Sequence, residues 1–162
     1  MKKNTLMVFL VLLVIVIFSQ NTFASGTYWA AGDIQYLKNA YNIEVKGDLD
    51  KPAEKDFQEL IFKLVGLNNN SEDELSRYKL LYYMVNSLQI KDLVKEECAE
   101  LLCVFEDTCK YCDKANMIPA KAKKAGLLRG RKTAEGLIMS INEPVTKAEL
   151  AVLAVRYLKT TR

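Results

Sequence analysis

The sequence predicts an all-α protein built from helix-loop-helix repeats, and three observations support this fold class. Apolar residues recur at helical spacing in one segment after another. No stretch beyond the first 24 residues alternates polar and apolar positions for long, as a half-buried strand does. Finally, one well-capped helix near the end, residues 146–158, has two weaker copies upstream.

The chain begins with a predicted signal peptide, residues 1–24. Lys2 and Lys3 precede an apolar run from Leu6 to Phe18, and small residues before Ser25 favour cleavage after Ala24. The run is shorter than the roughly 20 residues that cross a membrane. We therefore expect a chain that spans no membrane once the signal is cleaved, with an uncleaved anchor as the alternative.

The net charge and the absence of His argue against two classes of function. Two of the 23 Lys and Arg residues leave with the signal. The mature chain then has 21 basic residues against 20 Asp and Glu, so its net charge is almost zero. This balance argues against a nucleic-acid binder that relies on bulk charge. The chain has no His, which removes the commonest general base and the commonest metal ligand. We expect no enzyme, cofactor or metal site.

The first half of the mature chain predicts four helical stretches. The first runs from about Trp29 to Tyr41 and is followed by a loop at 42–50. Pro52 opens the second, Ala53 to Val65, which Gly66 ends. The Asn-rich break at 68–71 separates it from a helix that Ser76 caps, residues 77–88, and from a further stretch at 90–104.

The second half predicts two more helices. Pro119 opens one that stops at Gly126, and a polar loop then leads to Pro144. Thr146, with Glu149 three residues later, has the spacing of a capping box and begins the last helix. The most basic stretch, residues 121–132, is interpreted as a solvated face, with a contribution to polyanion binding as the alternative.

Three of these helices can be superimposed as repeats. With Ala53, Ser76 and Thr146 at the cap position, each has apolar residues four, seven, nine and twelve positions later. The predicted organisation is a first repeat at 25–67, a degenerate middle repeat at 68–104 and a third repeat at 105–162. A single unit of this size cannot bury both its helices, so we expect one stacked array.

The repeat motifs resemble those of the S-layer homology domain family. Residues 143–150 (Glu-Pro-Val-Thr-Lys-Ala-Glu-Leu) are similar to the family signature, in which Pro leads into Thr-Arg-Ala-Glu and an apolar residue. Phe105-Glu106-Asp107 resembles the Phe-x-Asp that opens a module, and residues 122–130 resemble its Gly-Leu-Ile-x-Gly helix exit. Residues 28–34 are similar to the first-helix pattern of another module.

The resemblance implies a fold and a function. Family members carry three modules in a three-sided prism, so we expect a pseudo-threefold helical array. They attach exported proteins to bacterial cell walls by binding secondary cell-wall polysaccharide, often pyruvylated. The family's ligand-facing Arg corresponds to Lys147 and Arg77, and in the first repeat to Glu54, with Lys55 beside it. Cations suit anionic pyruvyl groups, and Trp29 can stack on a sugar ring or fill a core.

Two other hypotheses remain open. Almost nothing would be left for these repeats to anchor, because they make up nearly the whole mature chain. The degenerate repeats can therefore bind another surface protein, or a second copy, and no glycan. A carboxylate-based glycan hydrolase is the third hypothesis, but it needs two facing acids, and no pair stands out.

Four cysteines lie close together, at Cys98, Cys103, Cys109 and Cys112. In an exported protein an even cluster favours two disulfides. Cys98 and Cys103 are five apart on a predicted helix, which favours bridges from this pair to the other two. A zinc site is the alternative, although the spacing of Cys98 and Cys103 fits it poorly, and free thiols are the third possibility.

Overall fold

The computed structural model describes residues 28–68, 74–107 and 117–162. The predicted signal peptide, with Cys109 and Cys112, lies outside this part. Residues 32–162 belong to one compact unit, and residues 28–31 belong to another. The described part is mostly helical, as the sequence predicts. Its elements, in chain order, are α2 (Ala31–Tyr41), α3 (Lys55–Val65), α4 (Arg77–Ser87), α5 (Lys95–Leu102), α6 (Ile118–Lys124), β1 (Arg131–Lys132), β2 (Leu137–Ile138) and α7 (Lys147–Thr160).

The caps of α4 and α7 are confirmed. The Ser76 hydroxyl accepts a hydrogen bond from the Lys79 amide at 3.2 Å, and the Thr146 hydroxyl accepts one from the Glu149 amide at 3.2 Å. The Glu149 carboxylate in turn accepts a bond from the Thr146 amide, which completes the capping box. Gly66 ends α3 in the left-handed conformation, at φ 70°, as expected.

The prediction for α3 was wrong by one position. Glu54, not Ala53, is the N-cap, so Lys55 is the first helical residue. The first repeat therefore has a cation where Arg77 and Lys147 stand in α4 and α7, and Glu54 is the counterpart of Ser76 and Thr146. The repeat alignment of the three helices was based on the apolar residues of α3, including Leu60. Leu60 is 44% exposed and does not lie on the buried face of this helix.

Two other predicted boundaries were also wrong. α2 begins at Ala31 instead of Trp29. α5 covers only Lys95–Leu102 of the helical stretch expected at 90–104. Gln89 has a positive φ of 50°, which a helix does not accommodate, so the chain leaves α4 there and runs without regular structure up to Val94.

The polar loop expected before Pro144 contains a small hairpin. Arg131 pairs with Ile138 and Lys132 with Leu137 in an antiparallel ladder. Strands of two residues are too short to show an alternating pattern in the sequence. Gly130, at φ 80°, leads into the hairpin where no side chain fits: a Cβ there would lie 2.6 Å from the Phe105 ring.

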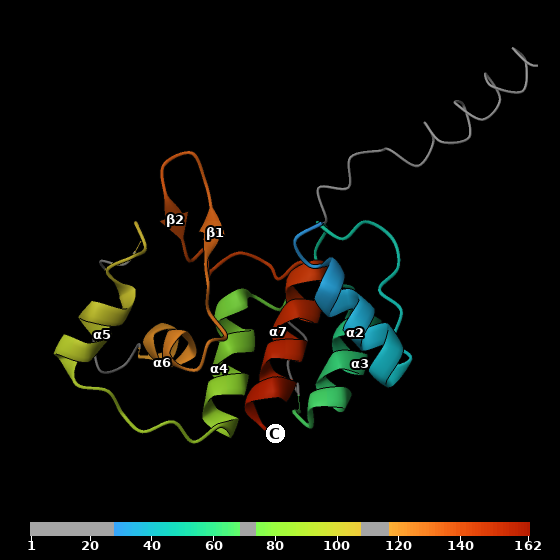
Figure 1. Ribbon diagram of the computed structural model, residues 1–162, viewed down its shortest axis with the longest axis horizontal. Helices are drawn as coiled ribbons and strands as arrows, with labels where there is room; N and C mark the ends of the chain where they lie inside the picture. The colour runs from blue at the N-terminus through green and yellow to red at the C-terminus, as the bar shows by residue number, and fades with distance from the viewer. Residues whose placement is uncertain (1–27, 69–73, 108–116) are drawn as a thin grey trace, which may run out of the picture. The chain divides into compact units, whose positions relative to one another are not determined.

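Helices α3, α4 and α7 run in parallel, with their first residues at the same end (Figure 1). α7 packs on α3, while α6 packs on both α4 and α5. At the other end, the hydroxyls of Ser87 and Tyr157 are 2.7 Å apart and link the ends of α4 and α7. Nine consecutive residues of α7, Lys147 to Val155, are buried, so this helix is surrounded on all sides.

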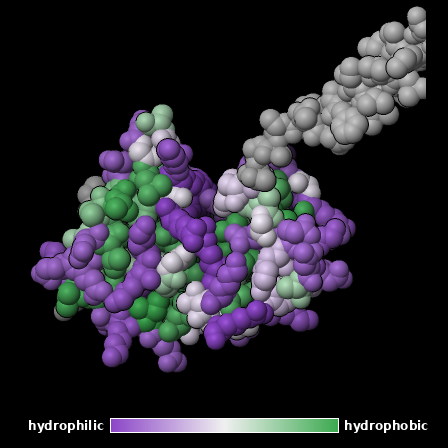
Figure 2. All heavy atoms as spheres, in the orientation of Figure 1, coloured by the Kyte–Doolittle hydropathy of each residue, from purple (hydrophilic) through white to green (hydrophobic). Residues whose placement is uncertain are grey.

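Hydrophilic residues cover much of the face seen in Figure 2, and hydrophobic residues reach the surface mainly on its α5 side. Val94, before α5, is 63% exposed, and Val104, after it, is 50% exposed. The two valines lie at opposite ends of α5.

Candidate functional site

The starts of α4 and α7 are held by two matching sets of backbone hydrogen bonds. In the α7 junction, residues 145–148 pair with residues 49–53; in the α4 junction, residues 75–78 pair with residues 141–145. Each junction has a bridge from a cap residue to a proline: Thr146 to Pro52 in the first, and Ser76 to Pro144 in the second.

The junctions match bond for bond. In each junction, the first amide of the helix donates to the carbonyl three residues before the cap of the neighbouring helix. These bonds run from Lys147 to Lys51, before the α3 cap, and from Arg77 to Glu143, before the α7 cap, each at 3.0 Å. The second amide of the helix donates to the carbonyl five residues before that same cap, at 3.1 Å in the α7 junction and 2.7 Å in the α4 junction. With the caps, the first three amides of each helix are satisfied. These helix starts therefore have no free amides for an anion, and any anion must be bound by side chains.

A group of four charged residues lies at the α4 junction. Arg131 donates two hydrogen bonds to the Glu149 carboxylate, at 2.6 and 2.8 Å, and it also pairs with Glu143. Arg77 Nη1 lies 3.2 Å from the same Glu149 carboxylate. The side chains of Arg77 and Glu149 are only 7% and 9% exposed. A doubly bonded Arg–carboxylate pair of this kind is among the strongest in proteins.

The surroundings shift the pKa values of this group. Burial alone would raise the pKa of Glu149, but the hydrogen bonds from Arg131 and the charge of Arg77 outweigh it and hold that pKa below its usual range. The hydrogen bond to Glu149 raises the pKa of Arg131. Burial lowers the pKa of Arg77, although Glu149 opposes this effect. Glu149 is thus ionised at neutral pH and neutralises its arginine neighbours.

Arg77 is buried and internally paired, not open to a ligand. Its Nε and Nη1 atoms have no hydrogen-bond partner within the described ranges, nor does the nearby hydroxyl of Ser140. The family resemblance predicts that the charge of Arg77 faces a ligand groove. In this structure that charge pairs with Glu149 instead.

Lys147 at the α7 junction is paired differently. Its ammonium donates to the Lys46 carbonyl at 3.1 Å and to the Glu54 carboxylate at 2.8 Å. Gly47 leaves room for it, since a Cβ at that position would lie 3.1 Å from Nζ. The Lys147 side chain is 9% exposed, whereas that of Glu54 is 74% exposed. One partner of the buried cation therefore lies in solvent.

The other predicted site residues are exposed. Lys55 makes no ion pair with any residue that the structure describes, and it lies beside Glu54 at the start of α3. Trp29 is 58% exposed, which excludes a fully buried core role, and its ring packs against that of Tyr28 at 5.8 Å. Trp29 belongs to the 28–31 unit and is therefore not placed relative to the three cations.

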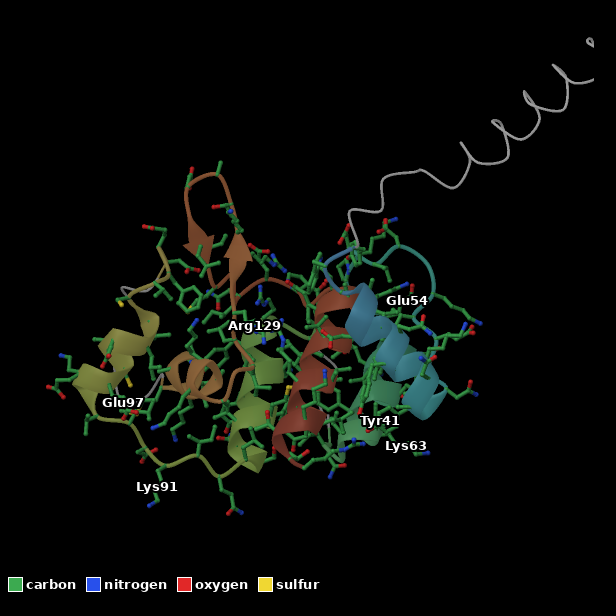
Figure 3. All side chains as sticks on the ribbon, in the orientation of Figure 1. Tyr41, Glu54, Lys63, Lys91, Glu97 and Arg129 are labelled. Atoms are coloured by element: carbon green, nitrogen blue, oxygen red, sulfur yellow. The ribbon has the colours of Figure 1, made fainter. Side chains whose placement is uncertain are left out.

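The basic stretch at 121–132 contains paired cations and two exposed ones, Arg129 and Lys132, that have no ion pair with a described residue. Lys121 and Lys124 pair with Asp92 and Glu97. In the view of Figure 3, Arg129 lies on the α4 side of α7 and Glu54 on the α2 side.

A shallow hollow lies next to the α7 junction. It has a volume of about 220 Å³ and is lined by Ile34, Gln35, Lys38, Glu44, Val45 and Lys46. Hydrogen bonds from Lys38 lower the pKa of Glu44, which pairs with Lys46 as well. Lys46 connects the hollow to the junction, because its carbonyl accepts the bond from Lys147.

The cysteine predictions are only partly accessible to the structure. Cys98 is buried in α5, and Cys103, at the end of that helix, is exposed. The Cys103 thiol donates to the Glu100 carbonyl at 3.0 Å. The favoured bridges to Cys109 and Cys112, and the alternative zinc site, involve positions outside the described residues and stay predictions.

Comparisons with protein-family models, with curated proteins and with solved structures find no match. Within the described ranges, no three acidic, Cys or His side chains gather as a metal site would require. The same ranges contain no helix with the length and hydropathy needed to traverse a bilayer. The resemblance to S-layer homology domains therefore stays a prediction based on the motifs.

Sequence reasoning missed the partners of the predicted cations. Glu149 was assigned only a capping role, and Arg131, 18 residues away, was one member of a basic stretch. Lys147 and Glu54 are 93 residues apart. The only local signal was the cap position of α3, where Glu54 is a poor capping residue.

Proposed function

We propose that this protein is exported to the bacterial cell surface and binds an anionic secondary cell-wall polysaccharide without catalysis. The observation that supports this best is the correspondence between the two junctions, in which the same backbone bonds recur at the same offsets. Such recurrence is what stacked copies of one structural unit produce. It agrees with the sequence motifs that resemble S-layer homology modules.

We also propose that the three units form a pseudo-threefold array. A third junction would join the start of α3 to the segment before α4. Its two helix-amide acceptors would fall within 69–73, outside the described residues, and its third acceptor would be the Ala53 carbonyl, to which the Leu75 amide does not bond. The first unit differs from the others near this point, since the Ala53 carbonyl accepts a bond from the Gln58 side chain at 2.6 Å.

The binding residues in this proposal are cations at the helix starts. Lys147 pairs with the exposed Glu54, Lys55 is an exposed residue that follows Glu54 in the chain, and Trp29 offers an exposed ring. Arg77 has a structural role at the α4 junction in this proposal and does not bind the polymer, because its charge is neutralised by Glu149. The exposed Arg129 is an added candidate on that side.

Sedimentation with cell walls from the producing organism tests this proposal. We expect the purified protein to sediment with intact walls and to remain in solution after the secondary polymer is stripped. Lys147→Ala should weaken binding at least about tenfold, because a hydrogen bond from a charged group is lost. Lys63→Ala is the matched control, since Lys63 is an exposed lysine at the far end of α3.

Failure of the unmodified protein to sediment with intact walls would contradict glycan binding. Equal losses in Lys147→Ala and Lys63→Ala would show non-specific attraction to a charged wall. Binding should also fall as salt concentration rises, because the attraction between charges is screened.

A second candidate function is binding to another surface protein. It is favoured by the internal neutralisation of Arg77 and by the exposed Val94 and Val104 on either side of α5. Substitution of both valines by Ser should abolish capture of such a partner and leave wall sedimentation unchanged.

A further inference from the structure

We propose that Glu54 is an internal competitor for the polysaccharide: its carboxylate occupies Lys147 in the unbound protein, and a carboxylate of the polymer must displace it. This inference rests on the proposed function and states how binding of the polymer at one of its sites is regulated. It concerns only the α7 junction, where Lys147 and Glu54 meet.

The first observation is that Glu54 does not serve its own helix. It is the N-cap of α3, but its side chain makes no capping hydrogen bond. Ser76 and Thr146, at the same position in α4 and α7, both do. Glutamate is not among the residues that N-caps favour. Its side chain is used across the junction instead, 2.8 Å from the Lys147 ammonium.

The second observation is that the two partners of the Lys147 ammonium differ in kind and in exposure. On one side are the backbone carbonyl of Lys46 and the backbone of Gly47, which cannot leave without unfolding the loop. On the other is the Glu54 side chain, which is 74% exposed. An incoming carboxylate can replace Glu54 at this ammonium without breaking any backbone hydrogen bond.

The third observation is the contrast with the α4 junction. There the carboxylate on the cation belongs to Glu149, whose side chain is 9% exposed and which also bonds Arg131 twice and the Thr146 amide. Removing that carboxylate would disrupt the cap of α7. Exchange with a ligand is therefore confined to the α7 junction, and Glu54 is the group that is exchanged.

The experiment compares apparent affinities for the wall polymer, measured by titrating the purified protein with increasing amounts of isolated walls. Glu54→Gln removes the competing charge, and Glu54→Ser removes it while supplying a capping hydroxyl that maintains α3. We expect both variants to bind up to about fivefold more tightly than the unmodified protein, the gain expected from losing one solvent-exposed ion pair.

Two further variants serve as references. Glu59→Gln removes the same charge from an exposed position on α3 that pairs with no described residue, and its affinity should not change. Combining Glu54→Gln with Lys147→Ala should abolish the gain, since the competitor acts only through Lys147. Thermal unfolding of each variant identifies any that are misfolded.

The outcomes separate this inference from the proposed function. Wall binding that depends on Lys147 but is equal in the Glu54 and Glu59 variants would overturn the inference and leave the function in place. Binding by the unmodified protein that becomes tighter in both Glu54 variants and stays unchanged in Glu59→Gln would support both. An absence of binding in every variant, all correctly folded, would overturn both together.

Discussion

At the scale of single residues, Glu149 connects more of the structure than any other side chain near the helix starts. It completes the capping box of α7, binds Arg131 through both oxygens and neutralises the buried Arg77. Removing one partner of a buried charge group leaves the others unpaired, which costs much more than the pair contributes by itself. Glu149 is therefore a structural residue within a motif that resembles a ligand-binding one.

The pKa of Glu149 predicts how acid destabilises the fold. This pKa is lower in the folded protein than in the unfolded chain, chiefly because the bonds from Arg131 outweigh burial. Such a carboxylate stabilises the fold fully above its unfolded pKa and loses that effect as pH falls through its folded pKa. We expect the free energy of unfolding to decrease when the pH is lowered below about 5. At pH 7, Glu149→Gln should lower the free energy of unfolding by about 3 kcal/mol.

Urea unfolding at pH 7 and at pH 4 measures both effects. Glu149→Gln should show a smaller difference between the two pH values than the unmodified protein, because the titrating group is gone. Glu59→Gln, an exposed control, should change the free energy of unfolding by less than about 0.5 kcal/mol. An unchanged acid dependence in Glu149→Gln would exclude Glu149 as its source.

Residue identities could be predicted from the sequence more easily than residue partners. The motif around Thr146 pointed to Lys147 and Arg77 as special cations, and both lie at matching positions in the structure. Their partners are far away in the chain: Glu149 lies 72 positions from Arg77, and Glu54 lies 93 from Lys147. Spacing in a single sequence does not encode such contacts.

At the scale of elements, the caps determine where the helices begin. α4 and α7 begin where Ser76 and Thr146 predict, because a hydroxyl there satisfies an amide that has no helical partner. α3 begins two residues later than the predicted Ala53, because Glu54 offers no such bond and backbone pairing of the preceding residues sets its start.

Loss of the α7 cap tests this account. Thr146→Ala removes one bond of the capping box and should lower the free energy of unfolding by about 1 kcal/mol. Thr160→Ala, near the exposed end of the same helix, should have an effect below about 0.5 kcal/mol. Chemical denaturation gives both values, and equal effects at the two positions would argue against a specific contribution from the cap.

The hairpin and the short α5 show where element prediction fails. β1 and β2 have two residues each and are positioned by Gly130, whose close contact with Phe105 comes from a distant part of the chain. The amides of Met139 and Ser140, just after β2, are held by the Asp107 carboxylate at 2.8 and 3.1 Å. Tertiary contacts of this kind override weak local preferences.

At the scale of the whole molecule, residues 32–162 share one core rather than three. Buried residues from α3, α4, α6 and α7 belong to a single contiguous cluster. This agrees with the expectation that no repeat buries its helices alone. The sequence supported that expectation through the repeated apolar spacing, although the order of helices around α7 depends on junction contacts that it does not reveal.

A core substitution in α7 should therefore destabilise the entire unit at once. Leu150 is fully buried, and Leu150→Ala should lower the free energy of unfolding by about 3 kcal/mol. Circular dichroism and tyrosine fluorescence should still give the same midpoint, as a two-state transition requires. Leu60→Ala, at an exposed leucine, should cost much less. Separate midpoints for the two signals would indicate independent repeats.

The central place of α7 has a consequence for the order in which the chain can acquire its structure. Since α7 is buried from Lys147 to Val155, α3, which packs on it, lacks this partner until these residues have been synthesised. Folding of a nascent chain follows the arrival of complete units. The shared core of residues 32–162 can therefore be completed only after the last helix has been made.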